Sequence, residues 1–506
     1  MADRFDVVIV GAGNAAMSAA HAALDRGASV CLVEKAPPED RGGNSSLTGH
    51  FRFVYENLDD LFAIMRPDTL TDAVRARFAA DMPSKTQGDV WDDIMSTTGG
   101  LSDPEMLQVH CERSYDTMAW LHSKGHMHVP SPDDFTGDGT GTRLDGGGEA
   151  MMERNFVYME AHPDVTILYE TSATELLTDD ASGRVIGVRV RSKTGVKDLH
   201  GGAVVLAAGG FESNAEMRTR YLGPRWDSVH LRGVPYNTGD GLRMALEIGA
   251  MPYGGWGSAH AAPVDWAMPT FSSLSRRRRP DAKWIRSNGQ SRYIYCYAIM
   301  VNTQGHRFID EAEGTRDQTY ASIGRGVLEQ PGSTAFQIID ANVREMKLLP
   351  AIYETATAFK ADTIEDLARE IGIDPVVLTQ TLADYNNAVP KDRQAVPSAY
   401  QVDGVGTVGL TPPKSNFAMT IDKPPFEAFQ VRCGMTFTFG GIKIDPQTAQ
   451  VQNVSGDPIP GLYCAGEMAG GLFYWNYPSG SGLMSGATFG RIAGDSAATA
   501  AKEVAG

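Results

Sequence analysis

The fold is decided by the stretch Asp6-Val7-Val8-Ile9-Val10-Gly11-Ala12-Gly13-Asn14-Ala15-Ala16, near the start of the chain. Its apolar run predicts a strand, its glycines predict a turn, and its small residues open a helix. Gly11 permits the tight turn, Gly13 lets the backbone approach a pyrophosphate, and Ala16 lets the helix pack closely on the strand. The phosphates would lie at the helix N-terminus, where N–H groups and the helix dipole favour negative charge. The stretch therefore predicts a dinucleotide-binding βαβ unit.

A carboxylate closes the second strand of this unit. Glu34 follows the apolar run from Ser29 to Val33, at the usual distance for accepting hydrogen bonds from a ribose diol. A carboxylate there also disfavours a 2′-phosphate, so we do not expect NADP at this site. The alternative is a glycine turn in an ordinary α/β unit. The preceding strand, the following helix and the acid together favour the dinucleotide.

Composition limits the classes of function. A chain of 506 residues with a net charge of −17 predicts two to four domains and argues against general nucleic-acid binding, because phosphates would be repelled. The cysteines are scattered without a C-x-x-C pair, which fits a reducing cytoplasm and argues against iron–sulfur, haem or zinc sites. The apolar runs are of strand length and the first residues carry no leader pattern, so we expect neither a membrane helix nor a secretory signal.

Glycine-rich turns recur along the chain, at Gly42-Gly43, Gly209-Gly210, Gly239-Asp240-Gly241, Gly466-Glu467 and from Ser479 to Gly482. So many places of close backbone approach indicate a large, fully wrapped cofactor, and hence FAD. The predicted cofactor-binding residues are Gly11, Gly13, Asn14, Ala15, Ala16, Glu34, Lys35, Gly42, Gly43, Asn44, Ser45, Ala173, Ala208, Gly209, Gly210, Asp240, Gly466, Glu467, Ser479, Gly482 and Leu483. We expect no metal ligands.

The character of the chain changes near Ser258, where Pro, Arg, Tyr and Trp become frequent and irregular segments lengthen. We therefore predict an α/β fold with a discontinuous FAD-binding domain at residues 1–257 and 435–506. This domain would be Rossmann-like, of the glutathione reductase type. Residues 258–434 would form an inserted α+β capping domain, which closes a cleft over the cofactor. Loops are expected at Arg41 to Ser46 and at Ser479 to Gly486, and a strand at Gly441 to Ile444.

The motifs resemble those of the fumarate reductase and succinate dehydrogenase flavoproteins over nearly the whole chain. They are Gly42-Gly43-Asn44-Ser45, Ala207 to Phe211, Gly239-Asp240-Gly241, Val301 to Glu311 and Gly461 to Glu467. Within that family, three further segments look like tricarballylate dehydrogenases, which desaturate a tricarboxylic acid to cis-aconitate. These segments are Arg41 to Ser45, Cys433 to Gly441 and Gly470 to Pro478.

The resemblance implies a mechanism. Hydride would pass between a substrate carbon and flavin N5, while an arginine of the inserted domain handles the proton at the neighbouring carbon. The matching residue is Arg316, and His260 falls where the family often places a substrate-binding histidine. Arginine normally keeps its proton, but desolvation beside the flavin would allow transient transfer. The alternatives are an ion-paired arginine and a structural histidine.

The chain departs from the fumarate reductases at two places. Where these carry His-His-Thr-Met-Gly-Gly, this chain has Thr436 to Gly441, and where they carry an Asn-Arg that clamps a carboxylate, it has Asn476-Tyr477. Loss of a bidentate arginine argues against fumarate as the substrate. Asn44 stands where succinate dehydrogenases link FAD through a histidine, so we expect non-covalent FAD.

Tyr477-Pro478 before a glycine-rich loop is also similar to 3-ketosteroid dehydrogenases, in which the matching tyrosine polarises a substrate carbonyl. The alternative is that Tyr477 only packs over the flavin edge. Arg52, Arg292 and Arg432 are further candidates for binding an anionic substrate, and each could equally be structural. The basic run Arg276 to Arg279 predicts either a solvated loop or a docking site for an anionic partner.

We therefore expect an FAD-dependent dehydrogenase that oxidises a C–C single bond next to a carboxylate or carbonyl, with tricarballylate as the first substrate to consider. The alternatives are a ketosteroid-like desaturase of a cyclic ketone and a non-catalytic FAD-binding redox protein. The sequence shows no haem, iron–sulfur or second flavin motif, so electrons would leave through a separate protein, a quinone or oxygen. The resemblance implies a membrane-associated partner for this step.

Overall fold

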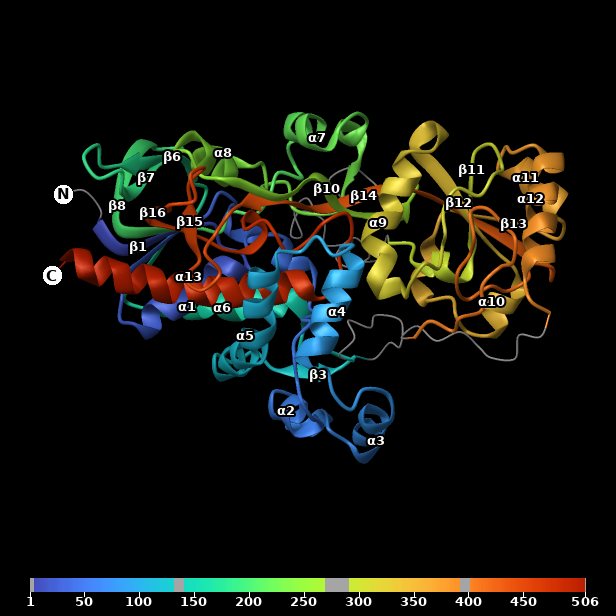
Figure 1. Ribbon diagram of the computed structural model, residues 1–506, viewed down its shortest axis with the longest axis horizontal. Helices are drawn as coiled ribbons and strands as arrows, with labels where there is room; N and C mark the ends of the chain where they lie inside the picture. Colours follow the sequence, from blue (N-terminus) through green and yellow to red (C-terminus); the bar gives the residue numbers. More distant parts are fainter. Residues whose placement is uncertain (1–3, 132–140, 269–290, 392–400, 506) are drawn as a thin grey trace.

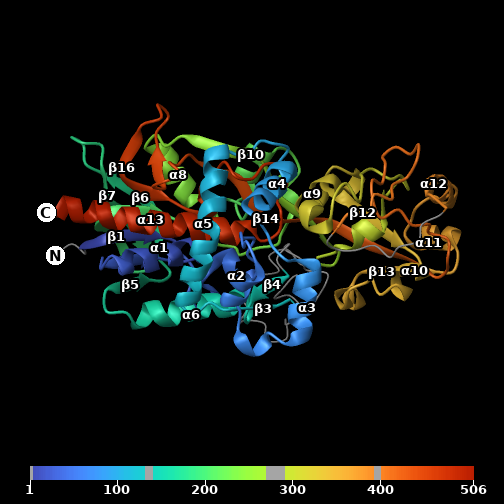
Figure 2. The same ribbon diagram turned by 60° about the horizontal axis from the view of Figure 1, so that its bottom comes forward.

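The computed structural model describes residues 4–131, 141–268, 291–391 and 401–505. The structure is elongated, and both chain termini lie at one end (Figure 1). The two views agree that the segment containing α11 (Ile364–Glu370) and α12 (Pro375–Ala388) forms the opposite end (Figure 2). The basic run Arg276 to Arg279 lies outside the described residues.

An eight-stranded sheet occupies the end that holds the termini. Its strand order is β15-β16-β8-β1-β2-β5, with β7 paired to β8 and β6 to β7. The pairs β16–β8, β8–β1, β1–β2 and β2–β5 are parallel. The strands are β1 (Arg4–Val10), β2 (Val30–Val33), β5 (Val165–Leu168), β6 (Ser172–Thr178), β7 (Val185–Ser192), β8 (Gly195–Leu206), β15 (Gln450–Gln452) and β16 (Pro458–Cys464). This parallel core confirms the predicted α/β fold.

Two helices from opposite ends of the sequence pack on this sheet and on each other. They are α1 (Asn14–Asp25) and α13 (Ser481–Ala505). A Cβ at Gly494 of α13 would lie 2.1 Å from the carbonyl oxygen of Ala19, so only glycine allows the helices to pack this closely. The other helices of this half are α2 (Leu58–Ala63), α3 (Asp72–Asp81), α4 (Gln87–Thr97), α5 (Pro104–Ser123), α6 (Gly147–Ala161), α7 (Ala215–Leu222) and α8 (Asp240–Glu247). A small ribbon of β3 (His128–Pro130) and β4 (Thr142–Leu144) completes it.

A six-stranded sheet forms the second half. Its order is β10-β14-β12-β11, and β9 and β13 also pair with β14. The strands are β9 (His230–Leu231), β10 (Pro252–Asp265), β11 (Ile299–Asn302), β12 (Thr334–Ile339), β13 (Ala358–Ala361) and β14 (Phe426–Ile442). The helices are α9 (Arg316–Leu328), α10 (Ala341–Glu345), α11 and α12.

The long antiparallel pair β10–β14 connects the two halves, and its register shifts between Gly255 and Ala259 and again after His260. The proposed domain boundaries, at residues 257/258 and 434/435, fall inside these two strands. The division into two domains therefore remains a prediction.

Three local predictions need correction. The chain from Gly43 to Leu47 forms a 3₁₀ helix, where we predicted a loop. Helix α13 begins at Ser481, so most of the predicted loop from Ser479 to Gly486 is its first turns. Of the strand expected at Gly441 to Ile444, only Gly441 and Ile442 are in a strand, as the end of β14, which begins at Phe426. The glycines in the first two segments led us to predict loops, but both segments contain helical structure.

The sequence analysis also made predictions about membrane helices and about the cysteines. None of the helices in the described part of the chain has the length and apolarity needed to cross a membrane. All five cysteines are free and buried. The cytoplasmic location itself remains a prediction.

Candidate active site

A long cavity begins at the C-terminal ends of β1 and β2 and reaches the face of β10, β14 and α9. Most of the predicted cofactor-binding residues line it: Gly11, Gly13, Asn14, Ala15, Glu34, Lys35, Gly43, Asn44, Ser45, Ala173, Ala208, Gly209, Asp240, Gly466, Glu467, Ser479, Gly482 and Leu483. The predicted catalytic residues Arg316, His260 and Tyr477 line it as well. The structure thus gathers residues from across the chain around one space.

Three predicted cofactor residues lie behind the cavity wall. Ala16 is fully buried within α1. Gly42 has a positive φ of 100° and precedes the 3₁₀ helix at Gly43. A Cβ at Gly210 would lie 2.1 Å from Glu467 Oε1, so this glycine leaves room for a cavity residue. These three residues do not line the cavity themselves, and their part in cofactor binding remains a prediction.

The turn after β1 brings the backbone of Gly11 very close to the backbone of Ala207. Gly11 has a φ of 109°, and a Cβ there would lie 2.3 Å from the carbonyl oxygen of Ala207. The backbone N–H of Asn14, at the start of α1, donates to Ser45 Oγ at 3.0 Å. The Asn14 side-chain amide donates to the carbonyl of Leu483 at 2.8 Å. Four distant chain segments therefore meet at the N-terminus of α1, the end that favours a phosphate.

Glu34 is buried on this wall, and its Oε1 accepts a hydrogen bond from the backbone N–H of Ala36 at 2.6 Å. Burial raises the pKa of Glu34 to about 7, against the lowering effect of nearby backbone N–H groups and of Lys35. Lys35 Nζ in turn pairs with Asp240 at 2.7 Å. A buried carboxylate at the end of β2, beside a glycine turn and a helix N-terminus, fits the ribose and pyrophosphate of a dinucleotide. The residues present therefore suit FAD.

Two further carboxyl groups, those of the buried Glu212 and the half-buried Glu467, lie beside the cavity. Glu212 Oε1 accepts hydrogen bonds from the side-chain amides of Asn237 at 2.6 Å and Asn44 at 2.8 Å. Glu467 Oε1 accepts from the backbone N–H of Thr438 at 2.7 Å. Burial, followed by repulsion from Glu467, raises the pKa of Glu212 well above its ordinary value, and burial also raises the pKa of Glu467. Burial therefore favours the protonated form of both carboxyl groups. Sequence reasoning identified Glu467 but missed Glu212, which follows the Gly209-Gly210 turn.

Arg316 is the first residue of α9 and is almost fully buried. Its guanidinium forms an ion pair with Asp317 and lies 5.7 Å from the centre of the Tyr293 ring. Burial lowers the pKa of Arg316, but Asp317, Tyr295 and Tyr293 together raise it more, so the net pKa lies above the ordinary value. The side chain is therefore a stable cation inside the cavity.

His260, on β10, contacts the rings of Tyr320, Phe437 and Tyr477, at centroid distances of 4.9, 5.1 and 5.4 Å. Burial lowers its pKa well below the ordinary value, and Arg232 lowers it further, so the ring is neutral. Its Nδ1 is buried and has no hydrogen-bond partner within the described part of the chain. The Tyr477 hydroxyl oxygen accepts a hydrogen bond from the backbone N–H of Gly482 at 2.8 Å.

The cavity also contains residues that the sequence did not single out. They are Arg232, Tyr293, Tyr320, Phe473 and His50, together with Ser291, Thr436 and Phe437. Among these residues, Arg232 matters most for the charge of the cavity, because it is a second arginine beside Arg316 in the lining that also contains His260. Its sequence neighbours carry no motif for an anion site. It could have been found only as one of several arginines in the chain.

The three other candidate arginines serve other contacts. Arg52 pairs with Asp93 and donates to the carbonyl of Ser479 at 2.8 Å. Arg292 is fully buried and pairs with Asp265 at 2.9 Å. Arg432 stacks over Trp266 at 3.6 Å. All three lie away from the cavity wall. These contacts favour a structural role for all three arginines over substrate binding.

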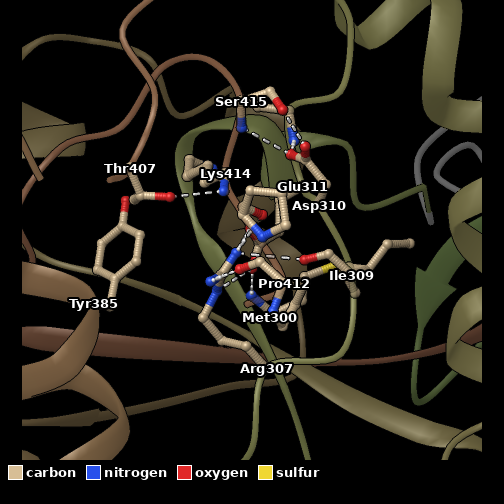
Figure 3. Close-up of polar contacts among 12 residues, drawn as sticks. Met300, Arg307, Ile309, Asp310, Glu311, Tyr385, Thr407, Pro412, Lys414 and Ser415 are labelled. Carbon is tan, nitrogen blue, oxygen red and sulfur yellow. Dashed lines mark hydrogen bonds and ion pairs between the residues drawn. The ribbon is translucent and has the colours of Figure 1, made fainter. Parts of the chain in front are cut away.

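The motif from Asn302 to Glu311 forms a buried network that precedes α9 (Figure 3). Arg307 binds Glu311 through both nitrogens of its fork, at 3.0 and 2.6 Å, and donates to the carbonyl of Pro412 at 2.7 Å. Met300 donates its N–H to Glu311, and the buried Lys414 donates to the carbonyl of Ala298 at 2.7 Å. The network anchors the chain shortly before Arg316, so this family motif has a structural role here.

Within residues 4–131, 141–268, 291–391 and 401–505, no group of three or more His, Cys, Asp or Glu side chains could hold a metal ion.

Comparison with known proteins identifies the family. The chain matches the FAD binding domain family over residues 6–49 and 72–483. It is 30% identical to a fumarate reductase (cytochrome) of Shewanella frigidimarina, over 99% of this chain and 78% of that protein. It is 26% identical to the 3-oxosteroid 1-dehydrogenase of Mycolicibacterium smegmatis, over 98% of both chains. The open conformation of a flavocytochrome c3 fumarate reductase superimposes with a TM-score of 0.70 and 26% identity, covering 99% of this chain and 79% of that one.

The chain therefore belongs to the family of FAD-binding proteins that includes these reductases and dehydrogenases. It is an FAD-dependent oxidoreductase that acts on CH–CH groups. The predicted fold, family and cofactor are confirmed. The resemblance to tricarballylate dehydrogenases and the non-covalent attachment of FAD remain predictions.

FAD affinity should depend on pH through Glu34. Ribose hydroxyls donate to the ionised carboxylate and lower its pKa on binding, so protonation near pH 7 opposes binding. We expect the affinity of the apoprotein for FAD to fall as pH decreases from 8 to 6, by up to about tenfold per unit below pH 7. Glu34→Gln should bind more weakly and lose this pH dependence, as measured by quenching of FAD fluorescence. Glu39→Gln is the control, and an unchanged pH dependence in Glu34→Gln would contradict the assignment.

The carboxyl groups of Glu212 and Glu467 should lower the free energy of unfolding at high pH. Because the folded pKa of Glu212 lies above its unfolded value, stability is greatest below the unfolded pKa and is lost as pH rises through the folded pKa. Glu212→Gln mimics the protonated carboxyl and should raise the unfolding temperature of the FAD-loaded protein at pH 8 by on the order of 2 °C, with little change at pH 5. Glu216→Gln, on the exposed face of α7, is the control. Equal shifts at both pH values would contradict the raised pKa of Glu212.

Proposed function

We propose that the enzyme interconverts a saturated and an unsaturated carboxylic acid, with tricarballylate and cis-aconitate as the first pair to test. The observation that supports this most directly is the position of Arg316, a buried cation at the N-terminus of α9 that lines the same cavity as His260. Bound FAD would accept the hydride in the oxidation and supply it in the reduction.

Non-covalent attachment of FAD is supported by the contacts of Asn44. Its amide nitrogen donates to Glu212 and to the carbonyl of Thr436 at 2.9 Å, and its oxygen accepts from the backbone N–H of Val234 at 2.8 Å. Both ends of the amide are thus occupied by protein groups. An amide nitrogen is also a poor nucleophile, unlike the imidazole that forms the linkage implied by the resemblance. We therefore propose that the cavity residues hold FAD by contacts alone.

Arg316 would handle the proton. In the reduction, the guanidinium donates it to the carbon next to the one that receives hydride. In the oxidation, the deprotonated side chain accepts it from that carbon as hydride leaves the neighbouring one. The raised pKa of Arg316 makes the protonated form dominant, so the oxidation should accelerate with rising pH. The neutral His260 would donate a hydrogen bond or accept one without adding charge.

The cationic environment favours a carboxylate over a neutral ketone. Arg316 and Arg232 both line the cavity beside the aromatic rings of Tyr320, Phe437 and Phe473. A carboxylate would form charge-assisted hydrogen bonds with either guanidinium as an ion pair, which a neutral ketone cannot do. Since the named relative from Shewanella is a fumarate reductase, a small carboxylate is the chemistry we propose for this chain. Electrons would pass to or from a separate carrier protein or a quinone.

A cyclic ketone remains the second candidate. Because the N–H of Gly482 donates to the hydroxyl oxygen of Tyr477, the Tyr477 hydroxyl becomes a stronger donor to a carbonyl. The surrounding rings of Phe437 and Phe473, with centroids 5.0 Å from that of Tyr477, provide an apolar wall. This arrangement would suit an enolate-like transition state.

Paired variants distinguish the two candidates and the non-catalytic alternative. With an artificial electron acceptor, the enzyme should turn over tricarballylate, and Arg316→Gln should lower kcat by at least about 100-fold because general acid–base transfer is lost. Tyr477→Phe should lower it by less than about tenfold, since loss of one neutral hydrogen bond costs about 1 kcal/mol. Arg325→Lys, on the same helix but outside the cavity, is the control for α9.

Two results would overturn the proposal. One is turnover of ketones without turnover of tricarboxylates, together with a large loss in Tyr477→Phe. The other is the absence of turnover with any saturated or unsaturated acid or ketone in either direction, which would favour the non-catalytic alternative.

A further inference from the structure

Aromatic rings surround His260 in the cavity that Arg316 also lines. The centroid of the His260 ring lies 4.9 Å from that of Tyr320, 5.1 Å from that of Phe437 and 5.4 Å from that of Tyr477. The rings of Phe437 and Tyr477 also contact each other, with centroids 5.0 Å apart. All of these residues line the cavity. We call Tyr320, Phe437 and Tyr477 the aromatic cluster.

Secondary structure holds the aromatic cluster in place. Phe437 on β14 lies directly opposite His260 on β10 in the antiparallel pair, so their side chains are neighbours. Tyr320 belongs to α9, which packs on β10. The hydroxyl oxygen of Tyr477 accepts a hydrogen bond from the backbone N–H of Gly482. Separate chain segments therefore fix the three rings before any ligand binds.

The aromatic cluster begins one helical turn away from Arg316. Tyr320 follows Arg316 by four residues on α9, and residues with this spacing share a helix face, with Cβ atoms roughly 5–6 Å apart. The Tyr293 ring lies between them, with its centre 5.7 Å from the guanidinium carbon of Arg316 and 5.3 Å from the centre of the Tyr320 ring. An acid that reacts at Arg316 can therefore reach the cluster with a group attached to its second reacting carbon.

The aromatic cluster offers apolar surface to the cavity. Tyr320 and Phe437 are half-buried residues of the cavity lining, and so is Phe473, whose ring centre lies 5.0 Å from that of Tyr477. Free energy is gained when an apolar group displaces water from such a surface. Aromatic rings add a preference for edge-to-face or offset contacts with another ring. A carboxylate in the same place would exchange water for ring carbon atoms, which costs free energy.

We infer that the aromatic cluster binds an aryl group of the substrate, so that the acids interconverted are a 3-arylpropionate and the matching 3-arylacrylate. This inference rests on the proposed function and names the substrate class of the same site. In the oxidation, the carbon next to the carboxylate gives its proton to Arg316, and the carbon that carries the ring gives a hydride to bound FAD. The double bond that forms between these two carbons is conjugated with both the carboxylate and the ring.

The aromatic cluster could also pack only on bound FAD. In that role, loss of a ring would weaken FAD binding and would affect the turnover of every acid alike. A ring that binds the aryl group should instead affect aryl acids alone and leave FAD affinity unchanged. Substrate selectivity, measured together with FAD affinity, therefore separates the two roles.

The test uses the FAD-loaded full-length protein and an artificial electron acceptor. Values of kcat/KM would be measured for 3-phenylpropionate, butyrate and tricarballylate in the wild type, Phe437→Leu, Phe437→Ala and the control Phe359→Leu. Phe359 is a half-buried residue of β13 that contacts Phe336 and lies outside the cavity lining. Perturbation of the flavin absorbance would give the Kd of cinnamate and of cis-aconitate without turnover. FAD content and unfolding temperature would report whether each variant folds.

In the wild type, we expect kcat/KM for 3-phenylpropionate to exceed the values for butyrate and tricarballylate by at least about tenfold, because only the aryl acid buries a ring on the cluster. Phe437→Leu should lower kcat/KM for 3-phenylpropionate and weaken cinnamate binding by about 3- to 10-fold, and Phe437→Ala should do so by more. The kinetics with butyrate, the Kd of cis-aconitate and the FAD content should change by less than about twofold, and Phe359→Leu should match the wild type.

Two results would overturn the inference while leaving the proposed function intact. One is a wild-type enzyme that acts on tricarballylate or butyrate at least as well as on 3-phenylpropionate. The other is an equal loss for all three acids in the Phe437 variants together with weaker FAD binding, which would assign the ring to the cofactor. Failure of the wild type to act on any of the acids would overturn the proposed function, and the inference with it.

Discussion

The pairing of β10 with β14 is the constraint on which the site depends. It places His260 opposite Phe437 and Ala259 opposite Thr438, and the hydrogen bond from Thr438 to Glu467 ties the same strands to the cofactor side of the cavity. Helix α9 packs on β10 at Gly324, where a Cβ would lie 2.6 Å from the carbonyl carbon of Ala261. This close packing fixes the helix whose first residue, Arg316, enters the cavity. One strand pair therefore aligns the cofactor side with the substrate side.

Charge is distributed along the cavity in a way that fits its two ends. The cofactor side carries the carboxyl groups of the buried Glu34 and the half-buried Glu467, which suit ribose hydroxyls and backbone donors. The opposite side carries the guanidinium groups of Arg232 and of Arg316, which is ion-paired with Asp317, around a neutral His260. Guanidinium groups form charge-assisted hydrogen bonds with carboxylates, so this end is suited to an anionic ligand. This separation supports an anionic substrate beside a dinucleotide.

The sequence could predict those parts of the site that depend on local backbone geometry. The turn at Gly11, the acid at Glu34 and the start of α8 near Asp240 are local features, and the structure places all three residues at the cavity. Arg316 was found because a family motif surrounds it. By contrast, Arg232, Arg292 and Arg432 are equivalent in sequence, and only tertiary contacts show that Arg292 pairs with Asp265 while Arg232 faces the cavity. Glu212 was missed for the same reason, since its partners Asn44 and Glu467 are distant in the chain.

Anaerobic mixing of the FAD-loaded protein with tricarballylate tests the central claim most directly. The account predicts that the flavin absorbance bleaches with tricarballylate, that cis-aconitate restores it after chemical reduction, and that cyclic ketones do neither. Bleaching by ketones with no response to either acid would contradict the account and would make Tyr477, rather than the arginines, the centre of the chemistry.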